Sequence, residues 1–254
     1  MVLKNRVYFS KKIVKNGYEN ESCCIVQWGE KELVLFSKDS TYALYTAKQQ
    51  GLYVKYLVTI FPERKDSWMF HHPCIELTKL QAKSLGISHI TRRSKGDKEK
   101  ELEDLRKVLE TVKDEVEGIV SGGVESTYQK SRIDKVCKEL NLKSFSPLWH
   151  RNPEELLKEE VNSGFEIIIS SVSTAGLDKN WLGRKIDMKA IEELKELHRK
   201  HGFHLAFEGG DAESLVLDCP IFKNRIKILD SKTVWDDKTS SGYLIVKKAI
   251  LVEK

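Results

Sequence analysis

Apolar residues in the first part of the chain form short continuous runs separated by longer amphipathic stretches. The runs predict strands at 33–36, 53–60, 116–120 and 143–146. The stretches with a helical repeat lie between them, at 41–50, 75–85, 98–112 and 127–140. Strands that alternate with helices form right-handed βαβ units, so we expect an α/β domain built on a doubly wound parallel sheet.

The second part of the chain has a different pattern. Asn152 and Pro153, followed by Glu155, predict a helix start. A strand at 165–172 and a helix at 187–201 follow, and then come short strands at 204–207, 214–217, 225–229 and 243–252. Late strands without intervening helices favour hairpins or a mixed sheet, which predicts a smaller C-terminal α+β domain.

These patterns divide the chain into three parts. Residues 1–32 are polar and basic with a turn signal at Asn16-Gly17, and we expect an appended strand pair or a loosely ordered arm there. A boundary near 147–152 then separates a nucleotide-binding domain at 33–150 from a substrate-binding domain at 151–254.

Two loops are candidates for phosphate binding. The first is Ser121-Gly122-Gly123-Val124-Glu125-Ser126, between a predicted strand and helix, where glycines admit a ligand and helix N–H groups face an anion. The second, Ser37-Lys38-Asp39-Ser40, has the same context but no glycine. The alternative is a turn with ordinary capping, because Ser126 and Gln129 have the spacing of a capping box.

An acidic loop and several aromatic segments are further candidates. Glu208, Asp211 and Glu213 surround Gly209-Gly210, which suits Mg²⁺, ammonium or an amine; the alternative is a glycine hairpin with solvated acids. The aromatic segment that includes His71, and the one that includes Trp149, predict either pocket walls or partly buried loops.

Composition narrows the class of protein. The 254 residues are 40% hydrophobic and 32% charged, as in a soluble globular protein. The net charge of +5 is small and the charges are interleaved, so direct nucleic-acid binding is not expected. Five scattered cysteines lack zinc-site spacing, and no long apolar stretch indicates a membrane span, so we expect a cytoplasmic protein.

The combined motifs resemble the diphthine–ammonia ligase family of the N-type ATP pyrophosphatase superfamily. The resemblance runs from about Leu33 to the C-terminus. It rests on KDSTYAL (38–44), SWMFHHPCIELTKLQAKSLG (67–86), GIVSGGVESTYQKSRIDKVCKEL (118–140), STAGLDKNWLGRKID (173–187), EGGDAESLVLDCP (208–220) and TSSGYL (239–244). The Trp-Leu-Gly-Arg and Glu-Gly-Gly segments are the most specific.

The resemblance implies a Rossmann-like, PP-loop ATPase fold and a ligase reaction. Family members use ATP, with Mg²⁺, to adenylate the carboxylate of diphthine, a modified histidine of translation elongation factor two, and amidate it with ammonium. The substrate is thus a protein. Whether the chain itself forms a homodimer is left open. The implied pyrophosphate-loop and nucleotide-facing residues are Ser37, Lys38, Asp39, Ser40, Gly122 and Ser126, with Asp39 as the Mg²⁺ ligand. The implied catalytic residues are Lys38, Glu208 and Glu213. The implied substrate-binding residues are His71, Tyr128, Gln129, Arg132, Trp149, Glu208, Gly209 and Gly210.

The chain departs from the family pattern at two motifs. Where the family has Ser-Gly-Gly-Lys-Asp-Ser, this chain has Leu-Phe-Ser-Lys-Asp-Ser, and Asp211-Ala212 replaces a Glu and an aromatic residue. Positive φ is costly without glycine, so the loop is expected to hold pyrophosphate less well. An active ligase, a paralogue that binds nucleotide or a partner without turnover, and an enzyme that adenylates another substrate, such as a corrinoid precursor or an RNA base, all remain open.

Overall fold

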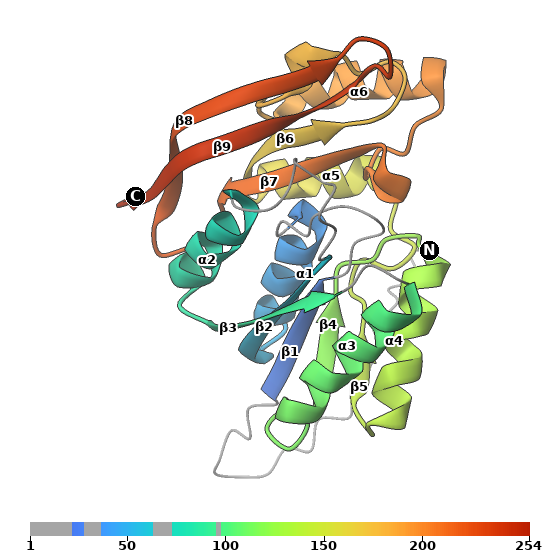
Figure 1. The fold of residues 1–254 in the computed structure, drawn as a ribbon, viewed down its shortest axis with the longest axis vertical. Coiled ribbons are helices and arrows are strands. Elements are labelled where there is room, and N and C mark those ends of the chain that lie inside the picture. Colours follow the sequence, from blue (N-terminus) through green and yellow to red (C-terminus); the bar gives the residue numbers. More distant parts are fainter. Residues whose placement is uncertain (1–21, 28–36, 63–72, 95–97) are drawn as a thin grey trace, which may run out of the picture.

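The computed structural model describes residues 22–27, 37–62, 73–94 and 98–254. Its N-terminal half is a sheet of five parallel strands in the order β3-β2-β1-β4-β5 (Figure 1). The strands are β1 (Ser22–Gln27), β2 (Tyr53–Pro62), β3 (Ser88–Ser94), β4 (Gly118–Ser121) and β5 (Lys143–Phe145). The order reverses between β1 and β4, and this confirms the doubly wound parallel sheet. Ligands of such sheets bind beyond the carboxyl ends of the strands at the reversal.

The sheet differs from the prediction at two strands. Residues 22–27, expected to belong to an appended strand pair or a loosely ordered arm, form the central strand β1. The strand expected at 33–36 lies outside the described residues and stays a prediction. Strand β3 was not expected at all. Strand β3 lies at the edge of the sheet and pairs with β2. An edge strand is less enclosed than a central one, so polar residues such as Arg92 and Arg93 are tolerated in it.

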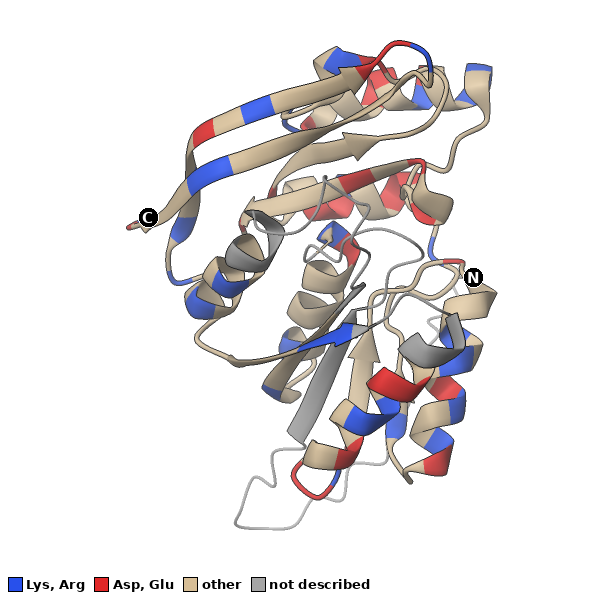
Figure 2. Ribbon diagram, viewed as in Figure 1, with Lys and Arg blue, Asp and Glu red and all other residues tan. Residues whose placement is uncertain are grey.

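Four helices cover the two faces of the parallel sheet. They are α1 (Lys38–Gln49), α2 (Pro73–Leu85), α3 (Lys98–Val112) and α4 (Thr127–Glu139). Helices α3 and α4 bury Leu105, Leu109 and Ile133 against Val58 and Ile119, which forms a core limited to this half. Lys and Arg are interleaved with Asp and Glu along the coloured parts of both helices (Figure 2).

The C-terminal half contains an antiparallel sheet in the order β7-β6-β9-β8, as expected for a smaller α+β domain. Its elements are α5 (Pro153–Asn162), β6 (Glu166–Val172), the short helix η1 (Lys179–Trp181), α6 (Met188–His201), the short helix η2 (Glu208–Gly210), β7 (Ala212–Asp218), β8 (Arg225–Asp236) and β9 (Ser241–Val252). Asn152 caps α5 by accepting a 3.0 Å hydrogen bond from the N–H of Glu155, as predicted.

The run 204–207 was expected to be a strand, and this is wrong. The N–H of His204 donates to Asp211 Oδ2 at 2.7 Å, and Phe207 has a left-handed φ of 63°. Both features belong to a loop that turns into η2. A strand would instead need extended backbone and neighbouring ladder partners.

The two halves share their larger hydrophobic core. Ala43, Leu44 and Leu57 from the N-terminal half are packed with Ile167 and Leu215 from the C-terminal half. Helix α1 therefore lies between the two sheets. The expected boundary at 147–152 falls in the connection between β5 and α5, but as a domain boundary it stays a prediction.

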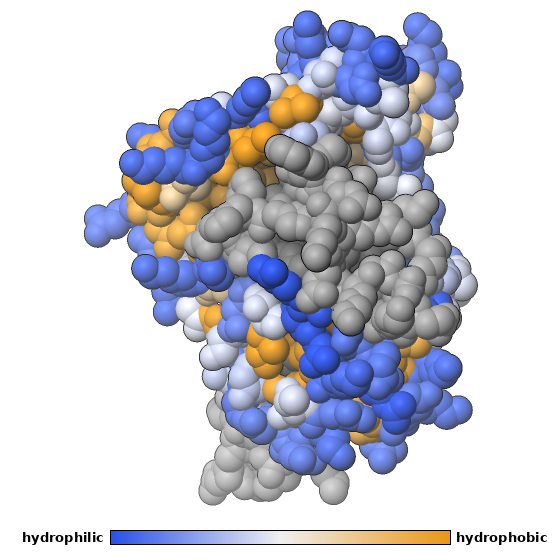
Figure 3. All heavy atoms as spheres, in the orientation of Figure 1, coloured by the Kyte–Doolittle hydropathy of each residue, from blue (hydrophilic) through white to orange (hydrophobic). Residues whose placement is uncertain are grey.

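Two further observations concern exposed apolar residues and the length of the helices. Apolar surface gathers beside the C-terminus on the β8–β9 hairpin (Figure 3), where Leu229 and Ile250 are exposed. Within the described ranges, no helix is both long and apolar enough to span a membrane.

Candidate active site

The start of α1 lies deep between the two halves. Ser37 caps the helix: its Oγ accepts a 3.4 Å hydrogen bond from the N–H of Ser40, and its carbonyl accepts one from the N–H of Thr41 at 3.1 Å. The next two residues, Lys38 and Asp39, are buried. Ser37 and Ser40 thus form a regular helix start, with Ser37 in a capping role.

Lys38 is the centre of a buried charged cluster. Its Nζ lies 2.5 Å from Asp39 Oδ1 and 3.7 Å from Glu160 Oε2 on α5. Burial alone would lower the pKa of Lys38, but the two carboxylates raise it above its usual value. Burial likewise raises the pKa of Asp39, and that of Glu160 to about 8, although Lys38 opposes both shifts. The cluster therefore brings two buried carboxyl groups to one ammonium group.

The loop that follows β4 packs directly on the first turn of α1. A Cβ added at Gly122 would lie 2.5 Å from the backbone nitrogen of Ser40 and 2.6 Å from its Cα, whereas one at Gly123 would meet nothing within 4 Å. Ser126 caps α4 through a 3.3 Å bond from the N–H of Gln129, so the capping interpretation holds for Ser126. The first of the two glycines is therefore required by close packing of two backbones.

Glu208 joins this loop to the C-terminal half. Its Oε1 accepts a 2.7 Å hydrogen bond from the N–H of Val124, and its Oε2 accepts a 2.9 Å bond from the N–H of Glu125. We expected the N–H groups of this loop to face an external anion, but these two already bind a carboxylate of the chain itself. Glu208 is placed by the glycine turn after it, in which Gly209 and Gly210 have φ values of 82° and 84°.

A second contact connects the same two loops. His204 Nδ1 accepts a 3.2 Å hydrogen bond from the N–H of Ala206, which leaves the proton of a neutral imidazole on Nε2. That Nε2 lies 2.9 Å from Glu125 Oε2 and donates to it. Glu125 is thus bound through its side chain to His204 and through its backbone to Glu208.

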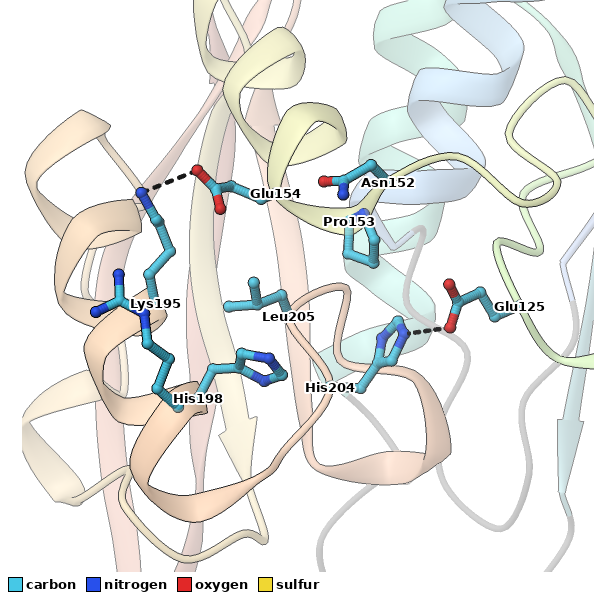
Figure 4. A pocket seen from close by; sticks show the side chains of 9 residues that line it. Glu125, Asn152, Pro153, Glu154, Lys195, His198, His204 and Leu205 are labelled. Atoms are coloured by element: carbon cyan, nitrogen blue, oxygen red, sulfur yellow. Dashed lines mark hydrogen bonds and ion pairs between the residues drawn. The ribbon is translucent and has the colours of Figure 1, made fainter.

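A cavity of about 440 Å³ opens beside this contact (Figure 4). The His204–Glu125 pair forms one wall, and Lys195 with Glu154, 2.9 Å apart, forms another. The lining residues are Glu125, Asn152, Pro153, Glu154, Lys195, His198, Arg199, His204 and Leu205. None of them is among the site residues that the family resemblance implies. Glu125 was expected in a phosphate-binding loop, Asn152 and Pro153 at a helix start, and His204 and Leu205 in a strand.

The other predicted site residues lie on several separate elements. On α4, the Arg132 guanidinium stacks 4.6 Å from the Tyr128 ring centroid, and Trp149 lies 5.7 Å from Lys130 Nζ. The neighbour of Trp149, His150, donates its N–H to the carbonyl of Val124 at 2.8 Å, which places this turn against the loop that binds Glu208. Glu213 lies in β7 opposite Ser171 of β6. His71 lies outside the described residues.

Comparisons with known proteins match the same family along most of the chain. The family model "Diphthamide synthase N-terminal domain" matches residues 30–144, and "Diphthamide synthase C-terminal domain" matches 152–252. The "Diphthine--ammonia ligase" of Bos taurus is 35% identical over 226 residues, covering 80% of this chain and 83% of its own. The Mus musculus protein of the same name is 32% identical over 248 residues, covering 87% and 92%.

A solved structure overlays more weakly. It is described as the predicted subunit of tRNA methyltransferase from Methanocaldococcus jannaschii DSM, with a TM-score of 0.41 and 17% identity, covering 78% of this chain and 97% of that one. A similarity at this level has no bearing on the site.

Proposed function

The chain belongs to the diphthamide synthase family, and from that premise we propose that it is an ATP-dependent ligase that converts diphthine on translation elongation factor two to diphthamide. Its relatives named diphthine–ammonia ligase support a role in diphthamide synthesis in general. The protein substrate, the ammonium donor and the site residues are the finer parts of the proposal.

In the proposed reaction, an oxygen of the diphthine carboxylate attacks the α-phosphorus of ATP, and pyrophosphate leaves. Ammonia, formed from ammonium by loss of a proton, then attacks the acyl carbon. The amide forms as AMP leaves and the nitrogen loses a second proton. Adenylation is needed because a carboxylate is a poor electrophile, whereas AMP is a good leaving group.

The observation that carries this proposal is the contact between Glu208 and the loop after β4. The Glu-Gly-Gly motif of the C-terminal half contacts a glycine loop that packs on the start of α1. This contact lies at the carboxyl ends of the parallel strands, where ligands of such sheets bind. Nucleotide and acceptor groups would have to meet at such a junction. We assign Glu208 to the acceptor side, and the loop with Gly122 to the nucleotide side.

Asp39 is the proposed carboxylate for Mg²⁺, which would offset charge on the phosphates when bound. In phosphate sites Mg²⁺ is usually held by one or two carboxylates together with phosphate oxygens. That arrangement fits the described residues, among which no three His, Cys, Asp or Glu side chains gather to hold a metal by themselves. Since Asp39 lies 2.5 Å from Lys38 Nζ, the ion would compete with this ammonium group.

The cavity beside His204 is the proposed site for the acceptor side chain. It lies next to Glu125, whose backbone is held by Glu208, and its walls carry groups of both signs. Lys195 and Arg199 can face a carboxylate, and Glu125 and Glu154 can face a cation. A side chain bearing a carboxylate would enter here and extend toward Glu208.

The proposal is tested by calorimetry with ATP and Mg²⁺, followed by pyrophosphate release from the same sample with and without the diphthine form of the elongation factor. Binding with release that depends on this factor supports the ligase. Binding without release supports the paralogue without turnover, which the missing glycines at Ser37-Lys38 favour. ATP turnover without diphthine amidation points to another acceptor, and no binding contradicts an ATP-dependent role altogether.

A further inference from the structure

Several groups of the C-terminal half lie close to Lys38. Besides Asp39, the described groups near it include Glu160 of α5, Ser214 of β7 and Phe207, and the charge of Glu208 also acts on it. Its backbone N–H donates to Ser214 Oγ at 3.2 Å, and its Nζ lies 5.9 Å from the Phe207 ring centroid. The side chain is fully buried, so its ammonium group faces the contact between the halves.

Glu160 is the unexplained member of this cluster. It is 0% exposed, and neither carboxylate oxygen has a hydrogen-bond partner among the described residues. The 3.7 Å approach of Lys38 Nζ is an ion pair but is too long for a hydrogen bond. Burial raises the pKa of Glu160, so the ionised form of this carboxyl group depends on a counterion, and Lys38 supplies it across the boundary between α1 and α5.

Lys38 is the first residue of α1, and the first turn of this helix packs on the glycine loop. Asp39 and Ser40 follow Lys38 directly, and the backbone of Ser40 is in contact with Gly122, where not even a Cβ would fit. The position of the glycine loop therefore depends on the position of the first turn of α1, which begins at Lys38.

We propose that Glu160 is a positioning residue: it pairs with Lys38 to hold the first turn of α1 against the glycine loop, and Lys38 is not a ligand of the nucleotide phosphates. This inference rests on the proposed function, because the loop so positioned is the one assigned to ATP. It opposes the role for Lys38 that the family resemblance implies.

The test is a double-mutant cycle with Lys38→Met, Glu160→Met and both together. Lys38→Met leaves the buried carboxyl groups of both Asp39 and Glu160 without their counterion, so the midpoint of thermal unfolding should fall by roughly 10 °C. Glu160→Met should cost less, because Asp39 still lies 2.5 Å from the Lys38 ammonium group. The double variant keeps similar volumes and lacks the buried Glu160 carboxyl group, so it should be more stable than Lys38→Met. Lys48→Met and Glu155→Met, at exposed positions of α1 and α5, are the matched controls.

ATP affinity of the double variant separates the two roles of Lys38. If Lys38 only positions α1, the double variant binds ATP within about threefold of Glu160→Met, because the pair is lost in both. A further loss of tenfold or more in a double variant that is folded would assign Lys38 to the phosphates and overturn the proposal. Failure of the double variant to regain stability would also overturn it, because the two residues would then not act as a pair.

The conservative variant Glu160→Gln tests positioning against a merely structural role. Measured well below its unfolding midpoint, it should raise the KM for ATP several-fold with little change in kcat, because the groups that bind ATP remain but are displaced. Unchanged KM and kcat would restrict Glu160 to stability and contradict positioning. If the unsubstituted chain binds no ATP, the proposed function fails, whereas the cycle in unfolding midpoints still decides whether the pair exists.

Discussion

The carboxylate of Glu208 accepts hydrogen bonds from the consecutive N–H groups of Val124 and Glu125, at 2.7 and 2.9 Å. One side chain of the C-terminal half thereby binds two backbone donors of a loop in the N-terminal half. Hydrogen bonds to a charged acceptor are stronger than neutral ones, so this contact sets the distance between the two motifs.

Replacement of Glu208 by Gln should abolish amidation and leave ATP binding largely intact. The Gln amide keeps one oxygen acceptor but turns an NH₂ group toward a backbone donor, which costs about 1–3 kcal/mol of unfolding free energy. Amidation assays, calorimetry and urea denaturation measure the three quantities. Glu253→Gln, at an exposed position, is the control. A Glu208→Gln chain that no longer folds would show that the contact is needed for structure before chemistry.

Gly122→Ala and Gly123→Ala should differ sharply although the two positions are adjacent. The new Cβ at 122 would lie 2.5 Å from the nitrogen of Ser40, whereas the one at 123 meets nothing within 4 Å. We expect the first substitution to cost several kcal/mol and to weaken ATP binding, because backbone atoms must move. The second should stay within about 0.5 kcal/mol of the original chain. Equal effects would mean that the loop can move away from α1 freely.

Insertion of Gly-Gly before Lys38 tests whether the first loop limits activity. The insertion restores the family's Ser-Gly-Gly-Lys-Asp-Ser and permits the positive φ that a loop around pyrophosphate needs. ATP binding, measured by calorimetry, should become tighter. Ala-Ala at the same place adds equal length without that freedom and should not have this effect. An unchanged dissociation constant after the Gly-Gly insertion would contradict a limiting role for this loop.

Stability should fall with acidification through the titration of His89. Burial, with a smaller contribution from Lys79, lowers the pKa of His89 from 6.5 to about 4, and its Nε2 lies 2.9 Å from Thr59 Oγ1. The unfolded chain takes up the proton near pH 6.5 and the folded chain only near pH 4, so stability is retained above 6.5 and lost as pH falls between these values. His89 is partly exposed, so we expect a loss on the order of 2 kcal/mol. Urea denaturation at several pH values should show a shallower slope for His89→Gln; the same slope in both chains would exclude this histidine as the cause.

Arg199→Gln should weaken the interaction with the protein substrate but not with ATP. Arg199 lines the cavity beside His204, whereas Lys200, the next residue of α6, is exposed and does not. We expect a several-fold higher KM for the elongation factor with Arg199→Gln and no change with Lys200→Gln. The same KM for both variants would place the acceptor outside this cavity.

Local signals in the sequence predicted much of the fold. The caps at Asn152 and Ser126 were identifiable because a capping residue and its partner are three positions apart. The strand prediction for 204–207 was wrong because the buried apolar side chains of this run belong to a loop. The carboxylate of Asp211, which binds the backbone of the loop, comes later in the chain. Strand periodicity cannot report such a contact.

The site was predicted less completely, for a related reason. The sequence marked Gly122 and Glu208 as candidates through their glycine-rich surroundings, but it could not pair them. Glu160 and Lys195 look like ordinary members of amphipathic helices. Only the packing of α5 and α6 shows that one is buried beside Lys38 and the other lines a cavity.

The core shared by the two halves has a consequence for synthesis of the protein on the ribosome. Tyr42 of α1 packs edge-on against Phe165 with their ring centroids 5.4 Å apart, and Leu44 belongs to the same core as Leu215. Chains emerge at about 5–20 residues per second, so the inner face of α1 waits roughly ten seconds or more for β6 and β7. During that interval the nascent chain exposes the apolar face of α1, which is the type of surface that holding chaperones bind.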